Sequence, residues 1–187
     1  FVSELKYYPP ETIYKDINAR EFFGLGAGMC PAIVDEAKNT FRAKSPIDFH
    51  IKFDYANQQA SSKYDIDVNF LMNYIGGPND EHVHQLDHPC FLFFADKPLT
   101  MTQLHPYYEE TQFSSVTMGI SGTYNISSWI RPVRPAFKFK KNENEIDITR
   151  GDTLCYFKFN TTEKIKMVRF DSIKITLASP EKIKSWS

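Results

Sequence analysis

The stretches AFKFK (residues 136–140), EIDI (145–148) and TLCYFKF (153–159) decide the fold class. Hydrophobic and polar side chains alternate through the first two, which is the period of a strand with one buried face. The polar segments at 141–144 and 150–152 are typical of turns, and the second leads into the third stretch. We therefore expect consecutive antiparallel strands in this part of the chain.

The remaining sequence continues the pattern. Phe and Tyr, which favour the half-buried surface of a strand, number 16 and 10 in a chain of 187 residues. Further strands, separated by Pro, Gly or polar segments, are predicted at 41–53, 66–71, 91–94, 99–104, 115–120, 165–170 and 173–177. Short helices are predicted at about 11–23 and 32–39, and loops at 55–63 and 76–80.

The sequence thus predicts an all-β fold, mainly β with one or two short helices. Strands at this spacing are typical of a single-domain barrel or sandwich, such as a jelly roll. We expect an extended N-terminal arm over residues 1–28, one β domain over 29–178 and a C-terminal tail over 179–187.

The charge distribution narrows the class of partner. The net charge of −1 combines an acidic segment, 1–130, with a basic one, 131–187, which suits an acidic partner or a neighbouring subunit. Nucleic acid is the less favoured partner, because the lysines alternate with apolar residues as on the solvent face of strands. The longest apolar run, 89–95, is shorter than the roughly 20 residues of a membrane span, so no membrane is expected.

Three cysteines without CxxC spacing are expected to be reduced and buried: Cys30, Cys90 and Cys155.

Histidines are concentrated in one region, where residues 81–88 have the sequence EHVHQLDH. On a strand, His82 and His84 point to the same face, as the HxH pair of a β-barrel metal site does. His105 or Glu109 is then the third ligand, and iron or zinc in a cupin-like enzyme is one hypothesis. The alternative is a solvated loop whose histidines bind nothing. No other cofactor is expected.

The segment WIRPVRP, which begins at Trp129, places Arg131 and Arg134 three positions apart in a chain stiffened by proline. Arginine offers a planar fork to carboxylate or phosphate, and a neighbouring aromatic ring stacks on a base or sugar. A phosphate or ligand site at these three residues is a second hypothesis. The alternative is a buried arginine that pairs with an internal acid, such as Asp35 or Asp48, and fixes the path of a loop.

Several segments together resemble a family of small proteins encoded by marine tailed bacteriophages. They are CPA at 30–32 with Asp35 and KN at 38–39, SPID at 45–48, WIRP at 129–132 and ITRGDTLCY at 148–156. The resemblance covers about residues 28–170. It implies a viral origin and no particular activity.

A more distant resemblance is to the dUTPase fold. SPIDF at 45–49 is similar to the AGxDL segment of that family, GISGTY at 119–124 to its GxIDxxY segment and ITRGDTL at 148–154 to its GDRIAQ turn. The likeness implies a β-clip barrel that often trimerises. However, Ser121 and Gly122 stand where that family has an isoleucine and its catalytic aspartate, and no Arg-Ser-Gly segment occurs. The resemblance therefore implies the fold without the activity.

Three functions follow as hypotheses. The favoured one is a non-catalytic, phage-encoded β domain that acts by protein–protein interaction, as a virion accessory component or a modulator of a host protein in the host cytoplasm. Its partner is another protein or further copies of itself, with a homotrimer as one option. The alternatives are a metal-dependent enzyme that uses His82, His84 and His105, and a nucleotide-binding dUTPase relative that uses Arg131 or Arg134.

Overall fold

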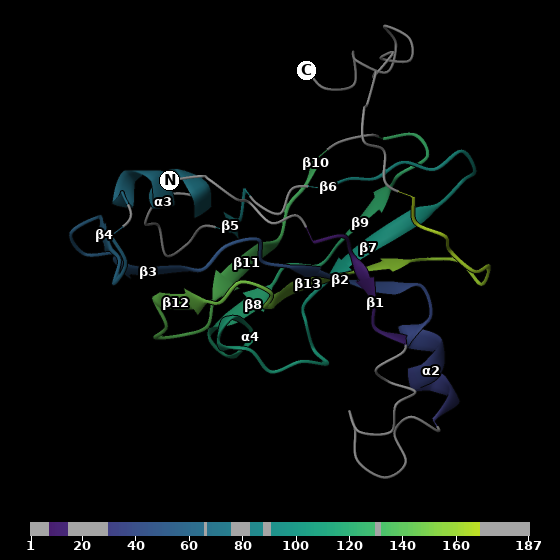
Figure 1. Cartoon of the computed structure of the whole chain (residues 1–187), viewed down its shortest axis with the longest axis horizontal. Coiled ribbons are helices and arrows are strands. Elements are labelled where there is room, and N and C mark those ends of the chain that lie inside the picture. The colour runs from purple at the N-terminus through teal and green to yellow at the C-terminus, as the bar shows by residue number, and fades with distance from the viewer. Residues whose placement is uncertain are drawn as a thin grey trace, which may run out of the picture.

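The computed structural model describes residues 8–14, 30–65, 67–75, 83–87, 91–129 and 132–168. Within these residues the chain is mainly β, as predicted, with thirteen strands in four antiparallel sheets and three short helices (Figure 1). Among the described helices, none has both the length and the apolar character that crossing a membrane requires.

The largest sheet has five strands. In order across the sheet they are β1 (Glu11–Thr12), β2 (Thr40–Lys44), β13 (Thr153–Phe159), β7 (Thr100–Leu104) and β9 (Gly122–Asn125). One face is covered by the short pair β6 (Phe91–Leu92) and β10 (Pro132–Val133). The rings of Phe91 and Phe157 on β13 meet edge to face, with centroids 5.3 Å apart, and both side chains belong to one buried cluster.

Two three-stranded sheets enclose a second hydrophobic core. One has the order β5 (His84–Gln85), β11 (Ala136–Phe139), β8 (Thr117–Gly119), and the other β12 (Glu145–Ile148), β3 (Phe49–Asp54), β4 (Gln59–Ser61). Phe49, Phe137 and Ile146 are fully buried between them. Since the described strands stack in separate sheets and close no barrel, the architecture is sandwich-like.

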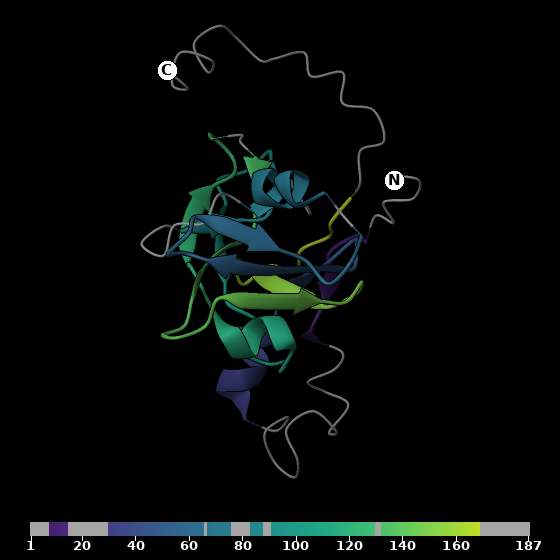
Figure 2. The same ribbon diagram turned by 90° about the vertical axis from the view of Figure 1, so that its left-hand side faces the viewer.

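The described residues include three short helices beside the sheets: α2 (Pro31–Ala37), α3 (Val68–Ile75) and α4 (Gln112–Val116). Figures 1 and 2 show α3 beside β4 and α4 beside β12, at opposite ends of the sheet that these strands form with β3. α2 begins with Pro31, a position where the missing N–H costs no hydrogen bond.

The strand predicted at 66–71 is wrong, because residues 68–75 form α3 and Ile66 lies outside the described residues. Leu71 and Ile75, four positions apart, are both fully buried, which is the spacing of a helix face. The Asp67 carboxylate accepts a hydrogen bond from the Asn69 N–H at 2.9 Å and so caps the first turn. Helical packing therefore prevails over the local alternation of polar and apolar residues.

Other boundaries also differ from the prediction. Glu11–Thr12, the expected start of a helix, forms β1 and pairs with β2, while 15–23 lie outside the described residues. The expected loop at 55–63 contains β4, and residues 115–116 of the strand predicted at 115–120 belong to α4. Residues 165–168 form no strand, and the rest of the strands expected at 165–177 lies outside the described residues.

The three strands that decide the fold class exist as β11, β12 and β13, but the expected pairing between them is wrong. β11 pairs with β5 and β8, β12 with β3, and β13 with β2 and β7. Each turn carries the chain into a different sheet, and each contains a residue with positive φ, Asn142 at 70° in the first and Gly151 at 96° in the second. Consecutive strands thus contribute to different layers of the sandwich.

The segments at 45–48 and 148–154, which belong to both the phage and the dUTPase resemblance, contact each other. The Ser45 N–H donates to the Asp152 carbonyl and the Gly151 N–H to the Ser45 carbonyl, each at 2.9 Å. The Arg150 N–H also donates to the Asp48 carboxylate, at 2.6 Å. Segments about a hundred residues apart in sequence therefore form one structural unit, in which the acidic residue of SPID binds backbone.

Candidate interaction surface

An uncharged segment forms two neighbouring edges of the sandwich. Residues 111–130 contain no Asp, Glu, Lys or Arg, in a chain in which 24% of residues are charged. The structure describes this segment as far as Trp129 and folds it into α4, β8 and β9. β8 and β9 are the outermost strands of two different sheets. We call β8, β9 and residues 126–129 the edge surface.

Hydroxyl groups form hydrogen bonds with backbone groups at both ends of α4, the helix that precedes this surface. The Thr111 hydroxyl accepts from the Ser114 N–H and the Ser114 hydroxyl accepts from the Thr111 N–H, which is a capping box. At the other end, the Thr117 hydroxyl donates to the Phe113 carbonyl at 2.6 Å. The ends of α4 are thus stabilised by hydroxyl groups, and not by charged side chains from the segment 111–130.

The outer edge of β8 is partly covered by His105, which directly follows β7. Its Nδ1 accepts a hydrogen bond from the Gly119 N–H at 2.9 Å. Burial, and then the ammonium of Lys140, lowers the pKa of His105, while a backbone hydrogen bond with Ser114 acts in the opposite direction. A neutral ring that accepts through Nδ1 fits this position. The neighbouring Met118 side chain is 52% exposed.

The outer edge of β9 faces away from β7. The Ile126 N–H donates to the Leu99 carbonyl, which makes these residues a hydrogen-bonded pair. Because such pairs alternate along antiparallel strands, Thr123, opposite Thr102, is a non-hydrogen-bonded residue whose N–H and C=O point outward. No strand among the described residues pairs with this side of β9.

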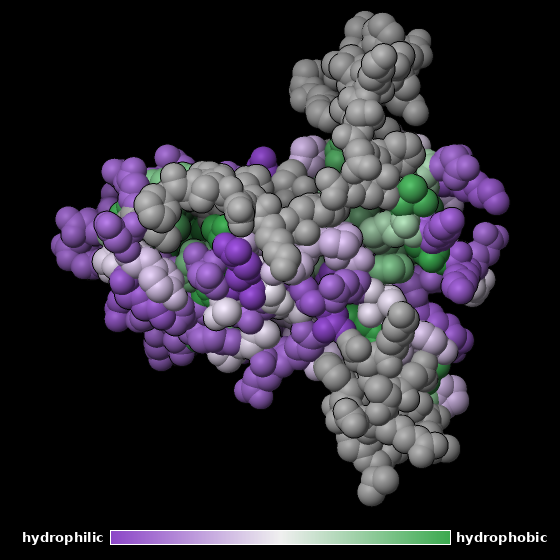
Figure 3. Space-filling view, viewed as in Figure 1, coloured by the Kyte–Doolittle hydropathy of each residue, from purple (hydrophilic) through white to green (hydrophobic). Residues whose placement is uncertain are grey.

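Aromatic and apolar side chains border β9. The rings of Trp129 and Tyr124 have centroids 6.2 Å apart, and Trp129 is 38% exposed. Tyr124 packs against the core cluster beneath β6, together with other half-buried apolar residues: Phe41, Phe93, Ala95, Leu99, Ile165 and Met167. Figure 3 shows hydrophobic surface over the part of the molecule where β7 and β9 lie in Figure 1.

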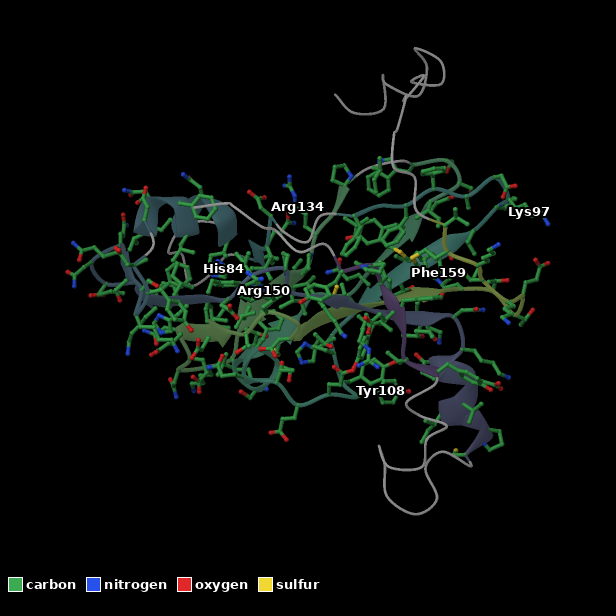
Figure 4. The ribbon with its side chains drawn as sticks, viewed as in Figure 1. His84, Lys97, Tyr108, Arg134, Arg150 and Phe159 are labelled. Carbon is green, nitrogen blue, oxygen red and sulfur yellow. The ribbon has the colours of Figure 1, made fainter. Side chains whose placement is uncertain are left out.

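The predicted metal ligand His84 is a core residue. Its imidazole stacks on Phe53 and Phe137, with centroid distances of 5.3 and 5.4 Å, and only 2% of the residue is exposed. The Nδ1 atom lies 3.3 Å from the Ile75 carbonyl. Figure 4 shows His84 inside the molecule. The expectation of a solvated loop is therefore wrong for this residue.

The remaining members of the predicted metal site are not brought together in the described residues. His84 and Gly119 lie on the two strands that flank β11, so about 10 Å of sheet separates their backbones. His105 is bonded to Gly119, on the far side of β11 from His84. His82 lies outside the described residues, within which no group of three potential metal ligands occurs.

Glu109, the alternative third ligand, is engaged with Arg42. The Arg42 Nη1 and Glu109 Oε1 atoms are 2.7 Å apart, and the side chains are 13% and 18% exposed. The Thr153 hydroxyl also donates to Glu109. A cavity of about 360 Å³ lies beside this pair, lined in part by Tyr108 and Lys140. The Lys140 ammonium donates hydrogen bonds to the Ser114 and Ser115 carbonyls, so two of its three donors are already engaged within the protein.

Of the predicted phosphate ligands, Trp129 belongs to the edge surface and Arg131 lies outside the described residues. Arg134 pairs with Asp87 at 3.5 Å, and both side chains are more than 40% exposed. Figure 4 shows Arg134 toward the outside of the molecule. The structure thus places Arg134 in an exposed ion pair with Asp87, and not in the buried pair with an internal acid that the alternative expected.

Two thiols are described, Cys155 and Cys30. Cys155 is buried, as expected, and burial raises the pKa of its thiol. Cys30 is exposed, so the expectation of a buried thiol is wrong there. It precedes Pro31 at the start of α2, where its backbone caps the helix and its side chain does not.

Comparison with known proteins adds no further constraint. No family model, curated protein or solved structure matches the chain.

Proposed function

We propose that this chain is a β domain that acts by binding another protein chain through the edge surface. The observation that supports the proposal is an outermost strand, β9, which has outward-facing backbone groups and no charged residue. Sheet edges that are meant to stay free are commonly protected by charged side chains, proline or very short length. β9 has neither charge nor proline, whereas the opposite edge, β1, has two residues, one of them Glu11.

The side chains around β9 also suit a protein partner. Interfaces are enriched in aromatic residues and Met and depleted of charge at their centres. Trp129 and Tyr124 provide such side chains beside β9, and Met118 is exposed on β8. The Thr123 backbone offers hydrogen bonds to an added strand. From the resemblance to phage proteins, we propose that this activity belongs to a tailed bacteriophage, in a virion component or a host-modulating protein.

Site-specific photo-crosslinking tests the proposal and needs no candidate partner in advance. A benzophenone amino acid is placed at Met118 or Trp129 and, as the control, at Gln59, which is exposed on the outer strand β4 of another sheet. The purified chain is then irradiated alone and in extract of the host. We expect discrete protein adducts from Met118 and Trp129, suppressed by an excess of unlabelled wild-type chain.

The Thr123→Lys variant supplies the matching competitor, because a lysine on β9 hinders strand addition while the side chain stays in solvent. An excess of Thr123→Lys chain should compete poorly. Adducts at Gln59 equal to those at Met118 and Trp129, or full competition by Thr123→Lys, would contradict the proposal.

A further inference from the structure

We infer that the partner strand of β9 is β9 of a second copy of this chain, paired antiparallel across a two-fold axis at Thr123. This inference rests on the proposed function and names its partner. It makes the five-stranded sheet of each copy continuous with that of the other.

The hydrogen-bonding groups of β9 fit this arrangement. Thr123 is a non-hydrogen-bonded residue of the pair with β7, so its N–H and C=O both point outward. In a two-fold pair centred on Thr123, the N–H of each Thr123 meets the C=O of the other. Asn125, also outward-facing by the same alternation, places its N–H opposite Ser121 of the second copy. Its C=O, which also points outward, accepts from the Trp129 N–H at 2.9 Å, so the turn at 126–129 occupies this end of the outer edge and the pairing runs from Ser121 to the Asn125 N–H.

The side chains are self-complementary as well. A two-fold axis places each residue near its own copy, so a charged edge would bring like charges together. β9 and residues 126–129 carry no charge, and therefore meet their own copy without repulsion between like charges. On the solvent face, the hydroxyls of Thr123 and Thr102 are 3.0 Å apart, and two such pairs adjoin across the axis. On the other face, Tyr124 and Trp129 come together with their copies.

The other edge of the sheet argues for a closed dimer. β1 is two residues long and carries Glu11, which forms a 2.7 Å ion pair with Lys44. Pairing β9 with β1 of a neighbour would produce an open chain of sheets, while pairing β9 with itself closes after two copies. Because a four-residue strand makes a small contact, we expect a dissociation constant on the order of 10–100 µM.

Analytical ultracentrifugation of the full chain at about 1 to 500 µM, a range that brackets this dissociation constant, tests the inference with a matched pair of proline variants. Thr123→Pro removes an outward N–H that β7 does not use, and proline is tolerated at such edge positions. Ala60→Pro is the control. The Phe53 N–H donates to the Asn144 carbonyl on the β12 side, so Phe53 does not bond to β4, and the N–H of Ala60, which lies opposite Phe53 on the outer strand β4, points outward. Circular dichroism and thermal melting verify folding, and Thr123→Lys serves if Thr123→Pro does not fold.

The expected result is a concentration-dependent dimer for the wild type and Ala60→Pro, with a monomer for folded Thr123→Pro and Thr123→Lys. A wild-type monomer throughout, a trimer, or a dimer that neither Thr123 variant weakens would overturn the inference. If the chain is monomeric but Met118 or Trp129 crosslinks to a different protein, the self-pairing fails and the proposed function stands. If the chain is monomeric and gives no specific adduct, both fail.

Discussion

The imidazole of His105 accepts a hydrogen bond from the backbone of Gly119, with Nδ1 and N 2.9 Å apart, so a residue that follows one sheet covers the edge of another. A Cβ at position 119 would lie 3.0 Å from the Cα, Cβ and Nδ1 atoms of His105. We expect Gly119→Ala to lower the free energy of unfolding by about 1–3 kcal/mol, because the His105 backbone must shift. Urea denaturation measures this effect. His105→Ala, which removes a hydrogen bond without a clash, should cost about 1 kcal/mol, and a larger loss there than in Gly119→Ala would contradict the steric argument.

The same contact predicts a pH dependence of stability. Burial and Lys140 lower the folded-state pKa of His105 below its unfolded value of about 6.5. The resulting stabilisation is full above the unfolded pKa and is lost as the pH falls through the folded pKa. We expect the melting temperature to drop between about pH 7 and 5, and to drop less in His105→Asn, whose side chain accepts without titrating. Equal profiles for the two proteins would assign the drop to other groups.

For the Arg42–Glu109 pair, we expect a single substitution to lower the free energy of unfolding more than the double substitution does. Both side chains are largely buried, so removing one charge leaves the other without its counterion. We expect Glu109→Gln to destabilise the fold by about 3–5 kcal/mol and the double variant Arg42→Met with Glu109→Met to cost less. Chemical denaturation of the single and double variants measures the coupling. Additive effects would show that the pair is not coupled.

Substitutions at His84 test whether the shape or the polarity of its ring determines its contribution to the stability of the aromatic core. Between Phe53 and Phe137, the ring fills a space that alanine would leave empty. We expect His84→Ala to cost about 3–5 kcal/mol, as for large aromatic truncations, and His84→Phe to cost clearly less because it retains the stack. Metal analysis of the same proteins tests the metal hypothesis separately, since stoichiometric iron or zinc that His84→Phe loses would support a ligand role for His84.

The fold class was predictable because strand period is a local property. The alternation in 136–140 and 145–148 depends on one buried face, whichever strand lies alongside. Pairing is not local: β11 and β12 are joined by a short turn, yet they belong to different sheets. At α3, local alternation was misleading, because the spacing of Leu71 and Ile75 matters only once a core exists on that side.

The candidate site was predictable only in part, for a similar reason. Trp129 was selected as part of a phosphate or ligand site, which stays a prediction, and its ring lies beside Tyr124 of β9. His84 was selected as a metal ligand, and its ring is part of the aromatic core. Titratable residues attract attention in a sequence, but the distinctive property of 111–130 is a lack of charge. A scan for uncharged runs would have marked this segment, although only the sheet order shows that β9 is an edge.

Trp129 provides an optical readout of self-pairing. Its ring is 38% exposed and lies beside Tyr124 on the border of β9, so pairing of two copies should remove water from it. In a Trp186→Phe background, where Trp129 is the remaining tryptophan of the two in the chain, we expect emission to shift to shorter wavelength as concentration rises through the dissociation constant. Thr123→Pro should abolish the shift while Ala60→Pro retains it. If emission depends on concentration equally in both variants, Trp129 senses an association that does not involve the β9 edge.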